Sequence, residues 1–130
     1  MPLLKLHVRK GRSQEETELL LDTAHQAMVR SFGVPERDRY QFLAEYDEAH
    51  FRILDTGLGI ARTGDVVFLE VVSRPRSRDA KLAFYRNLCS DLETRCRIAP
   101  SDVIVTFVIN TDEDWSFGYG HAQFVAGELQ

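Results

Sequence analysis

Two arginines separated by a single proline occur in the stretch SRPRS at residues 73–77. In an extended chain, residues two apart point to the same side, with their Cα atoms about 6.5–7 Å apart. Pro75 stiffens the backbone and favours an extended conformation at Arg74. The guanidinium groups of Arg74 and Arg76 could therefore bind a carboxylate or a phosphate together. The alternative interpretation is a solvated surface turn, since basic side chains are usually exposed.

A second group that could take part in chemistry is Pro2, which follows Met1 and precedes the strand-like run LLKLHV. Proline is tolerated at the first position of a strand because no ladder hydrogen bond is lost there. If Met1 is removed, Pro2 carries a secondary amine that can act as an acid, a base or a nucleophile. Burial and neighbouring arginines would favour the neutral amine, whereas a nearby carboxylate would favour the cation. The dipeptide alone leaves both interpretations open.

Two further stretches carry groups that could complete such a site. Asp38, in VPERDRY, is either an exposed acid in local ion pairs or a carboxylate that sets the charge of a nearby amine. In DWSFG, Trp115 and Phe117 are two apart and share one side of an extended chain. Such a pair usually packs in a core, but it can also form an apolar wall that excludes water. Phe124 and Leu129 could add to this wall.

The composition limits the class of protein. The chain has 130 residues, of which 44% are apolar and 28% charged, as is typical of one globular domain covering 1–130. A formal net charge of −4 gives no indication of binding to nucleic acid or to an anionic membrane. No apolar run approaches the roughly 18 residues that a membrane helix needs, and no signal peptide is visible. We therefore expect a cytoplasmic protein.

The cysteines and histidines indicate neither a disulfide nor a metal centre. Cys89 and Cys96 lie seven residues apart in a predicted helix, which places them about 10 Å apart along its axis, too far for a disulfide. We interpret them as thiols in a reducing compartment. The four histidines have no spacing typical of metal ligands. They are His7, His25, His50 and His121.

The chain repeats a strand–helix–strand pattern in two halves, at about 2–58 and 65–130. Ser13 and Glu16 form a capping box that begins the first helix, and Ser77 caps the second. The predicted strands cover 3–8, 39–46, 65–73 and 102–110, and the predicted helices cover about 13–30 and 78–96.

This pattern predicts an α+β fold in which two β-α-β units form a four-stranded sheet with both helices on one face. The strand at 65–73 is apolar on both sides, so we expect it inside the sheet. The other face of the sheet would be bare, and symmetric association of several copies would cover it. In the linker at 47–65, HFRIL could be a short strand. The glycines of TGLGI indicate a turn rather than a phosphate loop, because no helix follows.

Several motifs together resemble the tautomerase superfamily, whose members use an amino-terminal proline. The resemblance runs the whole length of the chain, and within the superfamily it is strongest to the decarboxylases of malonate semialdehyde. It is carried by MPLLK, AHQAM, FGVPERDRY, DTGLG, VVSRPRS, DVIV, DWSFGYG and GEL.

The resemblance implies a homotrimeric lyase that needs no cofactor or metal and converts malonate semialdehyde to acetaldehyde and CO₂, with a hydratase side activity. Related alternatives are a hydratase, dehalogenase or tautomerase of short unsaturated or 2-oxo acids. A non-catalytic trimer that binds a small carboxylate would follow if Met1 were retained. By the resemblance, Pro2 is the catalytic amine, Asp38 its acidic partner, Arg74 and Arg76 bind the substrate carboxylate, and Trp115, Phe117, Phe124 and Leu129 line the pocket.

Overall fold

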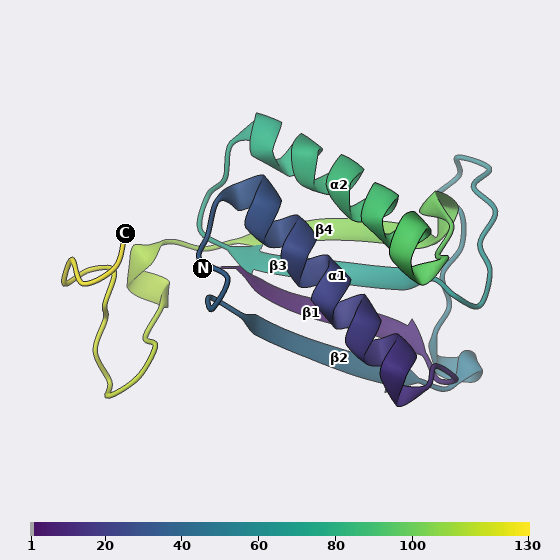
Figure 1. The fold of residues 1–130 in the computed structure, drawn as a ribbon, viewed down its shortest axis with the longest axis horizontal. Coiled ribbons are helices and arrows are strands. Elements are labelled where there is room, and N and C mark those ends of the chain that lie inside the picture. The colour runs from purple at the N-terminus through teal and green to yellow at the C-terminus, as the bar shows by residue number, and fades with distance from the viewer. Residues whose placement is uncertain (1) are drawn as a thin grey trace.

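The fold contains one mixed sheet of four strands and two long helices (Figure 1). The computed structural model describes residues 2–130, so the question of whether Met1 is removed lies outside the described residues. The strand order across the sheet is β2-β1-β3-β4. The elements are β1 (Leu3–Arg9), α1 (Gln14–Phe32), β2 (Tyr40–Tyr46), β3 (Val67–Ser73), α2 (Arg78–Cys96) and β4 (Val103–Ile109), with short 3-10 turns at Glu48–His50, Pro100–Asp102 and Asp112–Asp114.

The predicted repeat of architecture is confirmed by the strand pairing. β1 and β2 are parallel and joined through α1, and β3 and β4 are parallel and joined through α2. The two halves meet where β1 pairs with β3 in antiparallel fashion. β3 therefore lies inside the sheet, as its strongly apolar sequence predicted.

Local signals at the helix ends act as predicted. The Glu16 amide donates to the Ser13 hydroxyl (3.1 Å) and the Ser13 amide donates to the Glu16 carboxylate (3.0 Å). Gly33 ends α1 in the left-handed region at φ 65°, where a residue without Cβ fits best. The Ser77 hydroxyl accepts from the Ala80 amide (3.1 Å) at the start of α2. Among the described residues, no helix has the length and apolar character needed to cross a bilayer.

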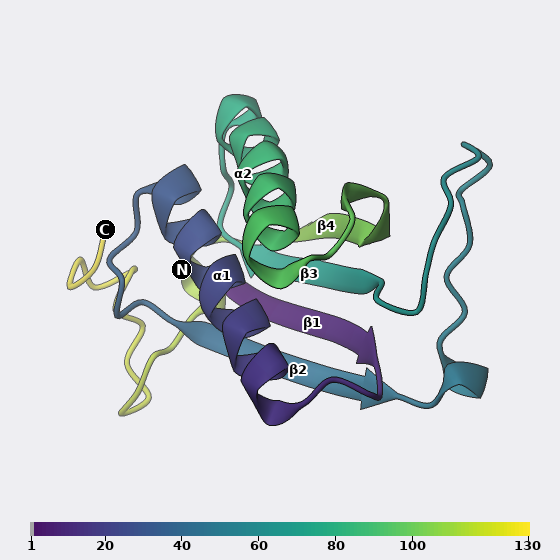
Figure 2. The same ribbon diagram turned by 45° about the vertical axis from the view of Figure 1, so that its right-hand side comes forward.

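Both helices cover the same face of the sheet and enclose the core (Figure 2). Alternate residues of β1 and β3 point into this core, because successive side chains of a strand face opposite ways. Leu82 of α2 is 42% exposed and stands outside the core. The buried core comprises Leu4, Leu6, Val8, Leu20, Ala24, Ala27, Met28, Val67, Leu69, Val71, Phe84, Leu88, Leu92 and Ile98.

No helix within residues 2–130 covers the opposite face of the sheet, which carries large apolar side chains. Phe42 is 62% exposed and Val108 is 48% exposed. Three polar side chains on this face bond to one another. His7 Nδ1 lies 2.6 Å from the Tyr46 hydroxyl, and His7 Nε2 lies 2.5 Å from a Glu70 carboxylate oxygen. Large apolar side chains are therefore exposed on this face of the single chain.

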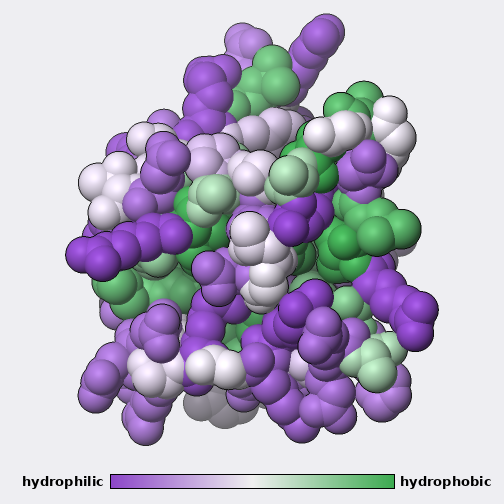
Figure 3. All heavy atoms as spheres, turned by 90° about the vertical axis from the view of Figure 1, so that its right-hand side faces the viewer, coloured by the Kyte–Doolittle hydropathy of each residue, from purple (hydrophilic) through white to green (hydrophobic). Residues whose placement is uncertain are grey.

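The connection between β2 and β3 projects from the body of the protein as an irregular arm. HFRIL is not a strand, because a 3-10 turn at Glu48–His50 is followed by chain without ladder pairing. Figure 3 shows this end of the molecule, where hydrophobic patches alternate with hydrophilic side chains. Leu54 and Leu58 on the arm are 82% and 73% exposed. Asp102 holds the returning end of the arm by accepting hydrogen bonds from the amide (2.7 Å) and hydroxyl of Thr63.

Replacing Asp102 with alanine is expected to destabilise the fold by about 1–3 kcal/mol, because two hydrogen bonds to a buried charged group are lost. Asp102 itself is only 1% exposed. Thermal unfolding at one fixed protein concentration measures the loss. The matched variant Thr63→Val loses the hydroxyl bond to Asp102 and the bond from the Asp65 amide, but it keeps the amide bond to Asp102. Its melting temperature should therefore fall less than that of Asp102→Ala. Equal melting temperatures for wild type and Asp102→Ala would refute this anchoring role.

Candidate active site

The register of the sheet brings the predicted site residues to one edge. Leu3 is paired with Tyr40 of β2 and with Val72 of β3. Pro2, which is buried, therefore lies beside the residues that lead into β2 and the residues that follow β3. Asp38 is in the first group, and the Arg74–Arg76 turn is in the second. The chain from β4 to the carboxyl terminus also lies at this edge (Figure 1).

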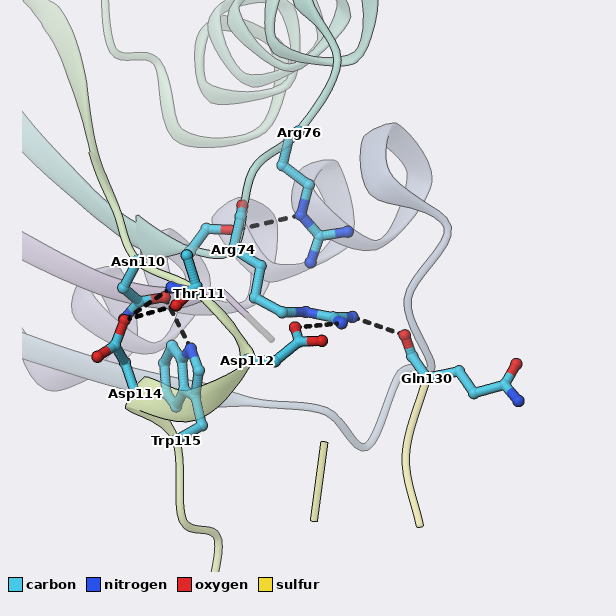
Figure 4. Close-up of polar contacts among 9 residues, drawn as sticks. Arg74, Arg76, Asn110, Thr111, Asp112, Asp114, Trp115 and Gln130 are labelled. Atoms are coloured by element: carbon cyan, nitrogen blue, oxygen red, sulfur yellow. Dashed lines mark hydrogen bonds and ion pairs between the residues drawn. The ribbon is translucent and has the colours of Figure 1, made fainter. Parts of the chain in front are cut away.

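Arg74 is held by the carboxyl-terminal segment (Figure 4). Its Nη1 lies 3.0 Å from Asp112 Oδ1, and its Nη2 donates to the main-chain oxygen of Gln130 (2.6 Å). Its guanidinium carbon is 3.8 Å from the centre of the Phe124 ring. Both terminal nitrogens of Arg74 thus bond to the chain itself.

Arg76 is held through its Nε atom, and its two terminal nitrogens remain available to a ligand. Its Nε donates to the Ser73 hydroxyl (3.1 Å), and that hydroxyl donates to the Arg74 carbonyl oxygen (2.8 Å). No described residue forms a hydrogen bond with its two terminal nitrogens. Burial and the neighbouring charge of Arg74 lower the pKa of Arg76, and Asp38 opposes this shift. A guanidinium stays protonated in proteins, so Arg76 offers a cationic fork for a carboxylate.

Asp38 is not the exposed acid that its surroundings in the sequence suggested. It is 4% exposed, and both carboxylate oxygens are buried without a hydrogen-bond partner in the described chain. Burial raises the pKa of Asp38, and nearby positive charges, among them Arg76, His25 and Arg74, oppose the rise. Buried carboxylates are normally bonded, so an unpartnered one is typical of a functional site.

Replacing Asp38 with asparagine is expected to stabilise the fold by roughly 1 kcal/mol at pH 7, because a buried unpartnered charge is removed. A raised pKa means that the carboxylate ionises less readily in the folded chain than in the unfolded one, so ionisation lowers stability as the pH rises. The gain should therefore be present at pH 7 and disappear below about pH 4, where aspartate is protonated in both states. Melting temperatures across this range test it. A loss of stability at pH 7 would contradict the prediction.

The predicted aromatic wall forms, except that no described contact joins Leu129 to it. Trp115 and Phe117 are stacked with ring centres 5.3 Å apart, and Phe124 meets Phe117 edge-on at 5.3 Å. Tyr40 also stacks on Phe117, with ring centres 5.9 Å apart. Leu129 lies in the last turn and is 37% exposed. The wall ends at Arg74, through the contact of its guanidinium with Phe124.

Three contributors to this edge were absent from our prediction. Asp112 pairs with Arg74, Ser73 orients Arg76, and Asn110 accepts a hydrogen bond from the indole nitrogen of Trp115 (2.8 Å). The role of Ser73 could have been predicted from the sequence, since it is a polar residue at the end of an apolar strand. The roles of Asp112 and Asn110 could not have been predicted, because their partners are recognised only once the chain has folded. Among the described residues, no group of three or more His, Cys, Asp or Glu side chains is arranged to hold a metal.

Comparison with known proteins identifies the family of this chain. Two family models, each described as a tautomerase enzyme, match residues 2–60 and residues 38–118. The chain belongs to the tautomerase family. The probable tautomerase YrdN of Bacillus subtilis (strain 168) is 48% identical to it over 129 residues, which cover 99% of this chain and 100% of YrdN.

Solved structures of this family have the same fold as the chain. Malonate semialdehyde decarboxylase, known in wild-type, mutant and inactivated forms, matches with a TM-score of 0.96 and 48% identity, over 98% of this chain and 99% of that one. FG41 malonate semialdehyde decarboxylase inhibited by 3-bromopropiolate matches with a TM-score of 0.93 and 34% identity, over 98% and 97%. A fused 4-OT described as a symmetric trimer shares the fold at a TM-score of 0.78 and 23% identity, over 96% and 98%. This tautomerase is therefore similar, over its whole length, to enzymes that decarboxylate malonate semialdehyde.

Proposed function

We propose that this tautomerase decarboxylates malonate semialdehyde to acetaldehyde and CO₂, with the amine of Pro2 as the catalytic group. The observation that carries the proposal is the meeting of Pro2, the unpartnered carboxylate of Asp38 and the open fork of Arg76 at one edge of the sheet. The 48% identity to malonate semialdehyde decarboxylase supports the choice of substrate. The proposal requires removal of Met1, since the Pro2 nitrogen is otherwise part of an amide.

Pro2 can supply the electron sink that loss of CO₂ requires in two ways. In a covalent route its nitrogen attacks the aldehyde carbon, water leaves, and an iminium ion forms. The bond to the carboxylate then breaks, CO₂ leaves, and the electron pair forms an enamine, which is protonated on carbon and hydrolysed to acetaldehyde and free Pro2. In a non-covalent route the protonated amine donates a hydrogen bond to the carbonyl oxygen, and an enol is formed instead.

In this proposal the arginines orient the substrate rather than stabilise the transition state. A salt bridge to the carboxylate favours the ground state, and the negative charge is lost as CO₂ departs. The useful contribution of Arg76 is to turn the bond that breaks into line with the carbonyl π system. The wall of Trp115, Phe117 and Phe124 excludes water and so favours the uncharged products.

A proton NMR time course with malonate semialdehyde tests the proposal directly. The protein is first shown by intact mass to lack Met1. We expect acetaldehyde to appear far faster than in buffer alone. If the substrate remains unchanged, decarboxylation of this compound is excluded, and 2-oxo acids and halogenated acrylates become the next substrates to test.

A second activity on the same site is hydration of short unsaturated acids. One observation favours it: the unpartnered carboxylate of Asp38 could position and activate a water molecule. The work on malonate semialdehyde decarboxylase concerns both its decarboxylase and its hydratase activities. The same NMR assay with a short alkynoic acid detects the product of hydration.

We also propose that the protein is a homotrimer, with the bare sheet face covered by neighbouring copies. The exposed Phe42 and Val108 on that face support this, and a fused 4-OT of the same fold is a symmetric trimer. Light scattering after size exclusion should give three times the 14.9 kDa of one chain. Phe42→Lys should lower that mass, because a charge would be buried in the interface. The control Tyr119→Lys changes an aromatic that is 97% exposed on the tail and should leave the mass unchanged.

A further inference from the structure

Phe117 is the centre of the aromatic wall, because three other rings contact it. The ring centres of Trp115 and Phe124 lie 5.3 Å from that of Phe117, and the ring centre of Tyr40 lies at 5.9 Å. Phe124 in turn contacts the guanidinium group of Arg74. The arrangement of the wall at the candidate active site therefore depends on where the backbone places Phe117.

The backbone that follows Phe117 has few contacts of its own. Gly118, Tyr119 and Gly120 have positive φ angles of 151°, 59° and 69°. The Tyr119 side chain is 97% exposed, so it contributes little packing. One isolated bridge joins Gly118 to His121. Because glycine loses more backbone entropy on folding than other residues, this segment needs further contacts to keep one conformation.

Gln123 supplies these contacts through its side-chain amide. Its Oε1 accepts from the Phe117 amide (2.9 Å), and its Nε2 donates to the Gly118 carbonyl (3.1 Å). A backbone amide can only donate and a carbonyl can only accept, so the two ends of the Gln123 amide cannot exchange places. One planar group thus holds the backbone of two successive residues.

The main chain of Gln123 also holds the last residues of the protein. Its carbonyl accepts from the Glu128 amide (2.9 Å) and from the Leu129 amide (3.3 Å). The next residue, Gln130, accepts a hydrogen bond from Arg74 through its main-chain oxygen (2.6 Å). Gln123 therefore connects the centre of the wall to the segment that Arg74 holds.

We propose that Gln123 is a positioning residue of the active site, which places the ring of Phe117 and so keeps the aromatic wall closed. It acts through Phe117 and not on the substrate itself. The inference rests on the proposed function, because the wall affects the reaction by excluding water as CO₂ leaves. No hydrogen bond joins Gln123 to Arg76 within residues 2–130, so binding of the substrate carboxylate should not depend on Gln123.

The first test uses Trp115, which is the one tryptophan of the chain. Its fluorescence therefore reports on the wall alone. Gln123→Met keeps the length of the side chain and loses both hydrogen bonds, and we expect acrylamide to quench Trp115 with a steeper slope than in wild type. The control Gln14→Met removes a glutamine hydrogen bond at the start of α1 and should leave the slope unchanged.

Gln123→Glu makes the same test depend on pH. Below about pH 4 a glutamic acid is protonated and again offers a carbonyl oxygen and a donor, as the amide does. At pH 7 it is ionised, and a carboxylate oxygen faces the Gly118 carbonyl without a hydrogen between them. We expect quenching close to that of wild type at the lower pH and stronger quenching at pH 7, each measured against wild type at the same pH.

Kinetics with malonate semialdehyde separate positioning from binding. In Gln123→Met we expect kcat to fall by roughly 10–100-fold, the loss expected when part of a site moves by up to about an ångström. KM should change little, because Arg76 keeps its terminal nitrogens free for the carboxylate. Gln123 lies outside the buried core, so the variant should fold with a melting temperature close to that of wild type.

Three results would overturn the proposal. They are equal quenching in wild type and Gln123→Met, an equal increase in Gln14→Met, or a rise in KM with kcat unchanged. If the wild-type protein does not decarboxylate malonate semialdehyde, the proposed function fails. The quenching measurements need no turnover, so they still decide whether Gln123 places the wall.

Discussion

Replacing Pro2 with alanine will lower kcat/KM for malonate semialdehyde by roughly 10²–10⁴-fold, the range expected when a positioned acid–base group is lost. Alanine keeps an amino terminus, but its primary amine lacks the ring that fixes the direction of the nitrogen at the start of β1. Steady-state rates of acetaldehyde formation measure the loss. The melting temperature should change little, because Pro2 precedes the paired residues of the strand.

The control for this variant is wild-type protein from which Met1 has not been removed. Its Pro2 nitrogen is an amide and can be neither nucleophile nor acid, so this fraction should be as inactive as Pro2→Ala. Intact mass distinguishes the two wild-type forms before the assay. If Pro2→Ala and the processed wild type have equal kcat/KM, Pro2 is not catalytic, and a protein that only binds a carboxylate becomes the better interpretation.

Replacing Arg76 with alanine will raise KM by roughly 100-fold, more than replacing Arg74 will. The terminal nitrogens of Arg76 form no hydrogen bond with the described chain, so they are available to the substrate carboxylate, and loss of charged hydrogen bonds worth about 3 kcal/mol corresponds to that factor. Arg74 already bonds to Asp112 and Gln130. Its replacement should chiefly loosen the carboxyl-terminal segment and lower the melting temperature.

Arg76→Lys is the matched variant, since it keeps the charge and removes the fork. A lysine cannot make two parallel bonds to one carboxylate, so KM should recover only in part. KM and kcat for all three variants, measured beside their melting temperatures, separate substrate binding from folding. A larger rise in KM for Arg74→Ala than for Arg76→Ala would reverse the roles given to the two arginines.

Several features of the fold could be predicted from the sequence. The caps at Ser13 and Ser77 and the alternation of β1 depend on residues within a few positions of one another, so local chemistry reveals them. The same holds for the interior place of β3, whose sequence is apolar on both sides. HFRIL is not a strand, and the sequence could not exclude one there, because an apolar stretch does not reveal whether another element lies against it.

The sequence by itself determined the order of the elements, the paired halves and the set of candidate residues, because spacing along the chain encodes them. Only the tertiary structure decided what each residue does. Asp38 became a buried, unpartnered carboxylate because the turn before β2 packs against α1. Arg74 and Arg76 became different because Asp112 and Gln130, which lie 38 and 56 residues further along, reach only Arg74. Burial and hydrogen bonding depend on residues that are distant in sequence, and such residues meet only when the chain folds.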